Sequence, residues 1–122
     1  MILVDTSIWI DFFDRGVPAL QTLLQRGEVL AHPFMIGEFA MGTPRNRKKI
    51  LADLADLPQA IVAQHDEVLH FIEAYQLFGL GIGYIDAHLL AAVRITPGAF
   101  LWTRDRRLHE VAEKLSLSFV PS

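Results

Sequence analysis

Short, wholly apolar runs alternate along this chain with longer segments in which apolar residues recur every three or four positions. Ile2–Val4 and Ala99–Trp102 are continuously apolar, which is typical of strands buried on both faces of a parallel sheet. Asp66–Phe78 instead carries its apolar side chains at the spacing of an amphipathic helix. Because strands separated by helices usually form parallel sheets, this alternation predicts an α/β domain with a central parallel sheet.

Each element can be placed on the chain by the same pattern. The predicted strands are Ile2–Val4, Val29–Ala31, Ala60–Ala63, Ala99–Trp102 and Ser118–Val120. The first predicted helix begins at Thr6 or Ser7 and runs through Phe13, and the later ones span Pro18–Gln25, Pro33–Met41, Arg45–Leu54, Asp66–Phe78, Tyr84–Arg94 and Asp105–Leu115. The stretch Gly79–Gly83, with three glycines, is predicted to be a loop that acts as a turn or hinge. It does not fit a phosphate-binding loop, because it lacks the preceding strand and the following lysine.

Length and composition narrow the class of protein. The 122 residues fit one domain, predicted to span 1–122, and a hydrophobic content of 52% is enough for a packed core. The absence of cysteine excludes a disulfide scaffold and thiolate zinc sites. No signal peptide is evident, and no run reaches the ~18 apolar residues of a membrane span, so we expect a soluble cytoplasmic protein. The net charge of −3 by itself argues mildly against binding nucleic acid.

Four acidic residues occur in apolar surroundings, whereas most other acids fall on predicted helix surfaces or turns. Asp5 and Asp105 come just after apolar strands. Glu38 lies among apolar or small residues, and Asp86 lies in a helix that is apolar nearly all round. An unpaired carboxylate is very costly to bury, so such groups are usually paired, protonated or bound to a metal ion.

The predicted topology can bring these four acids together. In open parallel sheets the functional crevice lies outside the carboxyl ends of the strands, where Asp5 and Asp105 are expected. The helices that carry Glu38 and Asp86 can border the same crevice. Converging carboxylates repel one another unless a cation binds between them, and an all-oxygen set of ligands suits Mg²⁺ or Mn²⁺.

Each of the four acids also has a purely structural interpretation. Asp5 and Asp105 can cap the helices that follow them. Asp86 can be an acid of the first helical turn that is favoured by the helix dipole, and Glu38 can pair with an arginine. These alternatives stay open for each residue, but together they require four separate explanations.

The acids belong to segments whose order and approximate spacing resemble those of PIN domains. These segments are Val4-Asp5-Thr6-Ser7, the single Glu38 in a mid-chain helix, Gly83-Tyr84-Ile85-Asp86-Ala87 and Thr103-Arg104-Asp105. The resemblance extends from Ile2 to the last predicted strand and is strongest to the VapC-type toxins of that family. Each motif alone is weak, whereas the ordered set is specific.

The resemblance implies a three-layer α/β/α fold and a ribonuclease that depends on Mg²⁺ or Mn²⁺. Asp5 and Asp86 would be the primary metal ligands, and Glu38 and Asp105 would complete the acidic cluster. Three hydroxyl-bearing residues would orient these acids or contact the scissile phosphate: Thr6, Ser7 and Thr103. The resemblance also implies a toxin–antitoxin pair, with a VapB-type antitoxin whose C-terminal segment covers the groove, and frequent homodimers. Attack by water would leave a 5′-phosphate and a 3′-hydroxyl.

Basic and apolar clusters are the candidate contacts for RNA and for a partner. The basic residues are Arg45, Arg47, Lys48 and Lys49 in one group, and Arg104, Arg106 and Arg107 beside Asp105. Both groups can also be solvated helix faces, although the group beside Asp105 is the better candidate for RNA contact because of that neighbour. The large apolar residues of the first and third predicted helices are expected to be core, with a groove for a partner helix as the alternative. The five histidines have no metal-binding spacing.

Other functions are compatible with parts of the pattern. A housekeeping PIN nuclease that processes RNA would have the same residues as a toxin. An aspartyl-phosphate enzyme of the haloacid dehalogenase kind would need a second acid two residues after Asp5, where this chain has Ser7. A non-catalytic binding module would not need all four acids.

Overall fold

The computed structural model describes residues 1–121 and contains a parallel sheet at its centre. Its strands are β1 (Ile2–Val4), β2 (Val29–Leu30) and β3 (Phe100–Trp102), in the order β2-β1-β3. Both pairings are parallel, and the register of β1 with β3 places Val4 opposite Trp102. The carboxyl ends of β1 and β3 therefore lie side by side.

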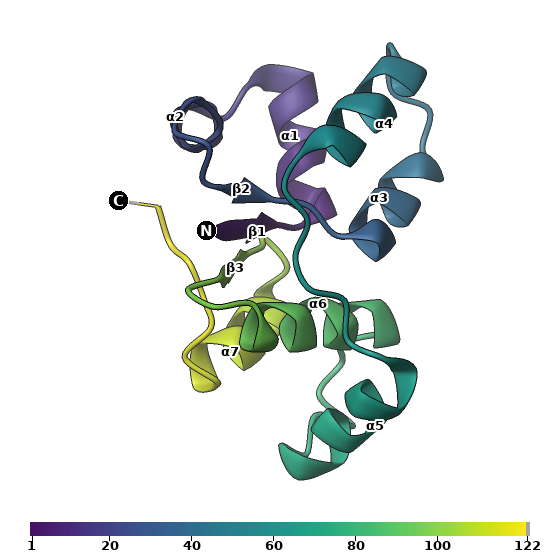
Figure 1. The fold of residues 1–122 in the computed structure, drawn as a ribbon, viewed down its shortest axis with the longest axis vertical. Helices are drawn as coiled ribbons and strands as arrows, with labels where there is room; N and C mark the ends of the chain where they lie inside the picture. Colours follow the sequence, from purple (N-terminus) through teal and green to yellow (C-terminus); the bar gives the residue numbers. More distant parts are fainter. Residues whose placement is uncertain (122) are drawn as a thin grey trace.

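The helices form a layer on each side of this sheet. They are α1 (Thr6–Arg15), α2 (Pro18–Gln25), α3 (Pro33–Ala40), α4 (Arg47–Asp56), α5 (His65–Ala74), α6 (Tyr84–Ile95) and α7 (Arg106–Lys114). In Figure 1, α1 to α4 lie above the sheet, α6 and α7 lie below it, and α5 lies beyond α6. The predicted three-layer α/β/α architecture with a parallel sheet is confirmed.

Two of the predicted strands do not form in the structure, because the chain makes only one isolated bridge to the sheet in or beside each of them. Residues 60–63 were expected to pair, but the bridge joins Ala31 to Gln59. Pro58 has no backbone N–H, and the Ile61 N–H instead bonds to the hydroxyl of Thr96 at 2.9 Å. The chain therefore leaves the edge of the sheet after one residue.

At the opposite edge the same thing happens to the predicted strand Ser118–Val120. Ser118 bridges to Leu101, whose N–H and C=O bond to Leu117 and Phe119. Val120 is 65% exposed, and Pro121 has no N–H to continue a ladder. The segment around Ser118 therefore pairs with β3 through a single bridge and does not form a further strand.

Helix ends differ from prediction where the backbone turns left-handed. α5 ends at Ala74 rather than Phe78, because Gln76 has a φ of 53°. α4 begins at Arg47 rather than Arg45, because Asn46 before it has a φ of 57°. Such positive φ values stop a right-handed helix.

The core lies on both faces of the sheet. Fully buried residues from β1, β3 and α6 include Leu3, Val4, Leu101, Leu89 and Leu90. The large apolar residues Ile8, Trp9 and Met35 are also core, as predicted, whereas Phe13 and Phe34 keep more than a third of their surface exposed. No helix within residues 1–121 is both long enough and apolar enough to cross a lipid bilayer.

Candidate active site

Asp5 is the anchor of the site at the end of β1. It is buried, and its Oδ1 accepts a hydrogen bond from the Thr6 N–H at 2.8 Å, which caps α1. Its Oδ2 accepts from the Ser7 hydroxyl at 3.2 Å and from the Thr103 hydroxyl at 2.7 Å. Asp5 therefore caps α1, which agrees with its structural interpretation. Its carboxylate is also held in place by three donors, from Thr6, Ser7 and Thr103.

Thr103 connects Asp5 to Asp105 at the adjacent end of β3. The Thr103 hydroxyl donates to Asp5 and accepts from the Asp105 N–H at 3.0 Å. Asp105 caps α7, where its Oδ1 accepts from the Leu108 N–H at 3.0 Å. The two strand-end acids are thus joined through one buried hydroxyl.

Asp86 lies in the first turn of α6 and is half-buried. Its Oδ2 accepts a hydrogen bond from the Gly83 N–H at 3.0 Å, which satisfies the start of the helix. Burial raises the pKa of Asp86, the Gly83 hydrogen bond opposes this rise, and the charges of Asp5 and Asp105 add to it. Asp86 is therefore within the electrostatic reach of both strand-end acids.

Glu38 completes the group from α3. Its Oε1 accepts from the Thr6 hydroxyl at 3.4 Å. Although Glu38 is exposed at the surface, partial loss of hydration raises the pKa of this carboxyl, and the charges of Asp5 and Asp86 raise it further. Asp5 is buried and Asp86 half-buried, whereas Glu38 and Asp105 are exposed, so the apolar sequence context of the last two does not bury their side chains.

Electrostatically, the four acids form one cluster, although they do not form a closed set of metal ligands. Asp5 acts on both Glu38 and Asp86, and Asp105 acts on Asp86. Within residues 1–121, no three Asp, Glu or His side chains are close enough together to hold a metal ion as placed. The chemistry of the donors nevertheless fits a hard divalent cation, because all of them are oxygens and their mutual repulsion favours bound positive charge.

The three cations beside Asp105 have different surroundings. Arg104 pairs with Asp11 at 2.6 Å, and its N–H donates to the Ser7 hydroxyl at 3.2 Å. Arg106 lies 3.7 Å from Glu110 on an exposed face. Arg107 lies across Gly81, which has a φ of 79° and where a Cβ would be 2.5 Å from Arg107 Nη1.

The basic residues around α4 also differ from one another. Arg47 donates from Nε and Nη2 to the Ala40 carbonyl, at 3.0 and 2.5 Å, and so satisfies the end of α3. Its Nε also bonds to the Gly42 carbonyl at 3.1 Å. Lys49 pairs with Asp53 at 2.9 Å, and Lys48 is exposed. Arg47 thus has a structural role that its position in a charge run did not indicate.

A groove of about 980 Å³ runs between α1, α3 and α4 and reaches Glu38. Its apolar lining includes Ile10, Phe13 and Phe39, and Arg45 and Lys49 stand among its charged residues. Ile10 and Phe13 are 56% and 39% exposed, although residues of this type are normally buried. The groove therefore offers an exposed apolar surface next to the acidic cluster.

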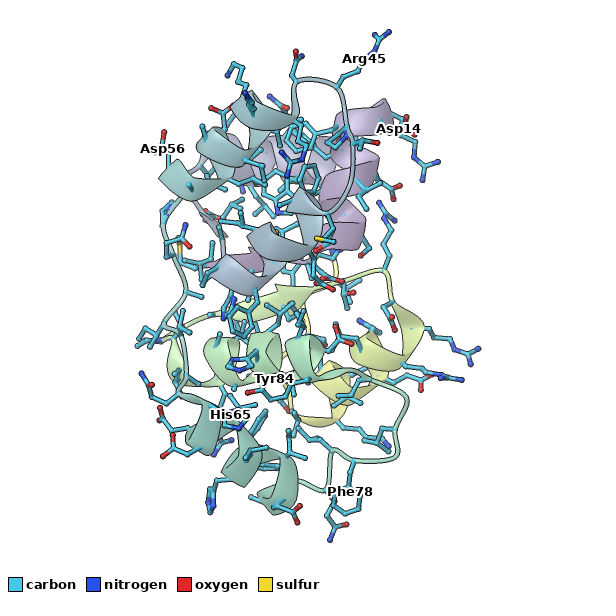
Figure 2. The ribbon with its side chains drawn as sticks, turned by 90° about the vertical axis from the view of Figure 1, so that its right-hand side faces the viewer. Asp14, Arg45, Asp56, His65, Phe78 and Tyr84 are labelled. Carbon is cyan, nitrogen blue, oxygen red and sulfur yellow. The ribbon has the colours of Figure 1, made fainter. Side chains whose placement is uncertain are left out.

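Sequence reasoning missed a cluster of aromatic and histidine side chains between α3 and α6. The Tyr84 hydroxyl contacts His65 Nδ1 and lies 2.8 Å from His88 Nε2. Figure 2 labels Tyr84 and His65 next to each other in the lower half of the molecule, where α5 and α6 meet. The available signal was the spacing of Tyr84 and His88, which share a face of α6 at i and i+4.

Comparison with known proteins gives the family. The PIN domain profile matches residues 2–114, a range that contains all four acids. The chain belongs to the PIN-domain family. It is 45% identical over 108 residues to proteins named Ribonuclease VapC32 from Mycobacterium tuberculosis strains CDC 1551 / Oshkosh and H37Rv. This alignment covers 88% of the chain and 87% of each relative. The matched range includes Asp5 and Asp105 just after β1 and β3, Glu38 in α3 and Asp86 in α6.

Proposed function

We propose that this PIN domain is a metal-dependent endoribonuclease that acts as the toxin of a toxin–antitoxin pair. The observation that carries the proposal is the hydrogen-bond network that joins Asp5 to Asp105 through Thr103 and to Glu38 through Thr6. Asp86, at the start of α6, is near enough for the charges of Asp5 and Asp105 to raise its pKa, after the larger effect of burial. The identity of 45% to ribonucleases named VapC32 supports RNA as the substrate and a toxin as the biological role.

Asp5 and Asp86 would hold Mg²⁺ or Mn²⁺, with Glu38 and Asp105 completing the set of carboxylates. These residues fit such an ion because crowding of negative charge already raises the pKa of Glu38 and Asp86, after the larger effect of burial. A divalent cation, when bound, lowers the pKa of water and screens the negative charge that develops on the phosphate.

The chain's own residues orient the carboxylates and receive the substrate. Ser7 and Thr103 fix Asp5, Thr6 holds Glu38, and the start of α6 holds Asp86. Water oxygen attacks phosphorus, the bond from phosphorus to the 3′-oxygen breaks, and the 3′-oxygen takes up a proton. The products are a 5′-phosphate and a 3′-hydroxyl. Exposed cations, such as Arg106 next to Asp105 and Lys48 on α4, can contact phosphates of the RNA.

A VapB-type antitoxin would cover the groove between α1, α3 and α4 with its C-terminal segment. The exposed apolar side chains of Ile10 and Phe13 match the apolar face of a partner helix. Because Thr6 and Glu38 line the groove, a segment bound there would block access to Glu38 and the acids next to it. Replacement Ile10→Arg should leave the nuclease active but no longer neutralised when both proteins are co-expressed.

The decisive experiment is a calorimetric titration of Mn²⁺ into the purified protein without antitoxin, followed by an RNA cleavage assay. Asp86→Asn removes one charge from the cluster, and Asp53→Asn makes the same change at an exposed acid paired with Lys49. We expect saturable Mn²⁺ binding and cleavage by the native chain and by Asp53→Asn, and neither by Asp86→Asn. Binding that survives in Asp86→Asn, or a native chain that binds no Mn²⁺, would overturn the proposed mechanism.

A further inference from the structure

Tyr84 presents a fixed aromatic ring on α6, the helix that carries Asp86. It is the first residue of α6, and 41% of its surface is exposed. Its hydroxyl lies between His65 Nδ1 and His88 Nε2. The His65 ring lies edge-on to the Tyr84 ring, with centroids 5.5 Å apart. Figure 2 shows Tyr84 and His65 together at the surface. A half-exposed tyrosine that is held at its hydroxyl loses little further freedom when it binds a flat ligand.

Phe34 of α3 supplies a second ring on the other side of His88. The His88 ring lies edge-on to Tyr84 at 4.7 Å and to Phe34 at 4.5 Å between centroids. His88 itself is buried, whereas Phe34 is 37% exposed. Two partly exposed rings thus flank one buried ring, at the place where α3 packs against α6.

Both exposed rings are close to the acids along their helices. Phe34 precedes Glu38 by four residues, so the two side chains share a face of α3 about one turn apart. Tyr84 precedes Asp86 by two residues, so the two are neighbours in the first turn of α6 but their side chains leave the helix on different faces. A nucleotide next to a phosphate held at the acids would therefore meet Phe34 on the face of Glu38, and would cross the first turn of α6 to reach Tyr84.

We propose that Tyr84 and Phe34 form a stacking platform for an RNA base next to the scissile phosphate, with His65 and His88 holding the tyrosine ring in place. Single-stranded RNA is recognised largely by stacking of unpaired bases on aromatic side chains. This inference rests on the proposed function, and it adds a source of nucleotide specificity, since the phosphate held at the acids is the same beside every base. Tyr84 and Phe34 contact the base, and His65 and His88 are positioning residues.

The test uses a short single-stranded RNA of mixed sequence that carries a fluorescent base analogue. Binding is measured with Ca²⁺ in place of Mn²⁺, and cleavage is measured with Mn²⁺, with the cut sites read by sequencing. We expect Tyr84→Leu and Phe34→Leu to weaken RNA binding and raise KM about tenfold to a hundredfold, with a smaller change in kcat. The nucleotide preference beside the cut should also broaden, while Mn²⁺ binding stays unchanged.

Two further variants separate stacking from folding and from the hydroxyl contacts. Tyr84→Phe keeps the ring face needed for stacking but loses the hydroxyl contacts to His65 and His88, so its KM should lie between those of the native chain and Tyr84→Leu. Phe78→Leu removes an aromatic residue that is 59% exposed and lies at the far end of the molecule in Figure 2, so its KM should be native. A leucine variant that loses Mn²⁺ binding or its cooperative melting is replaced by the other one.

The outcomes distinguish this inference from the proposed function. Native RNA binding, KM and cut-site preference in folded Tyr84→Leu and Phe34→Leu would overturn the stacking platform while leaving the nuclease intact. A changed oligomeric mass in these variants, with native KM, would make the rings an interface between copies of the chain and would also overturn it. RNA binding that depends on Tyr84 in a protein that cleaves no RNA would overturn the nuclease but support the platform. A native chain that neither binds nor cleaves RNA would overturn both.

Discussion

The hydroxyl of Thr103 lies 2.7 Å from Asp5 Oδ2, although the two residues are 98 positions apart in the chain. The contact exists because β1 and β3 pair in parallel with Val4 opposite Trp102, so that the next residue of each strand emerges at the same edge. The same hydroxyl accepts the Asp105 N–H. Thr103 therefore sets the relative position of two acids of the cluster.

Replacement Thr103→Val should reduce ribonuclease activity about tenfold to a hundredfold, which is the usual cost of removing a group that orients a metal ligand. Valine has nearly the same shape, so the core stays filled, but Asp5 and the Asp105 N–H each lose a hydrogen bond. Because Thr103 is buried, the free energy of unfolding should also fall by about 1–3 kcal/mol. Steady-state cleavage and urea unfolding measure the two effects.

Thr103→Ser is the matched control, since it keeps the hydroxyl and removes only a methyl group. It should retain most of the activity that Thr103→Val loses. Equal activity of the valine and serine variants would show that the hydroxyl does not position the acids.

Asp86→Asn should lose activity without losing stability. Neutralising Asp86 removes repulsion from Asp5 and Asp105, and the asparagine oxygen can still accept the Gly83 N–H. Because Asp86 is only half-buried and water screens its charge, the free energy of unfolding should rise by at most about 1 kcal/mol. Thermal melts without metal measure this change.

Added Mn²⁺ should reverse the order of stability of the two proteins. An ion that binds only the folded chain raises Tm in proportion to the logarithm of its concentration. The native protein should gain this increase and Asp86→Asn should not. An equal increase in both would show that Mn²⁺ binds somewhere other than the acidic cluster.

The four acids could be picked out from sequence because each of them lies in, or shortly after, a segment that is mostly apolar. Asp5 and Asp105 follow apolar strands, and parallel strands bring their carboxyl ends to one edge. The predicted strand at 60–63 was wrong because an apolar run shows only that a segment can pair. Whether it pairs depends on distant partners, here the hydroxyl of Thr96 that takes the Ile61 N–H.

The aromatic cluster and the role of Arg47 could not be found in this way. Phe34 meets His88 only because α3 docks on α6, and no local pattern encodes that contact. Arg47 belongs to a run of basic residues, but its donors bond to the carbonyls of Ala40 and Gly42 after the chain turns at Asn46. Both features depend on how separate helices pack.

Arg47 and Lys48 should therefore respond differently to substitution. Arg47→Ala removes charge-assisted hydrogen bonds to the end of α3 and should lower the free energy of unfolding by about 1–3 kcal/mol. Lys48→Ala removes an exposed charge and should change stability by less than about 0.5 kcal/mol. Urea unfolding separates the two variants.

In RNA binding, Lys48→Ala should have a larger effect than Arg47→Ala if Lys48 contacts a phosphate. Loss of one such contact lowers affinity for all sequences and reduces the slope of log affinity against log salt by about 0.7 for a single strand. A salt slope in Lys48→Ala equal to that of the native chain would remove Lys48 from the RNA surface.

Stability should fall in mild acid because of His32. This residue is fully buried and caps α3, where its Nδ1 accepts the Phe34 N–H at 3.0 Å. Burial, with a further contribution from nearby His88, lowers the pKa of His32 from 6.5 to about 4. Below pH 6.5 His32 binds a proton in the unfolded chain but stays neutral in the folded chain until about pH 4. The free energy of unfolding should therefore fall by about 3 kcal/mol between pH 6.5 and about 4.

His32→Asn isolates this contribution, because an asparagine oxygen can still accept the Phe34 N–H but does not titrate. The raised pKa values of Glu38 and Asp86 act in the opposite direction, since the folded chain then binds protons more readily, and the lowered pKa of His88 acts in the same direction as His32. These three groups remain in both proteins, so the difference between native and His32→Asn stability should shrink as pH falls from 6.5 to 4. Urea unfolding across this range measures the difference, and a constant difference would mean that His32 is charged in the folded protein or neutral in both states.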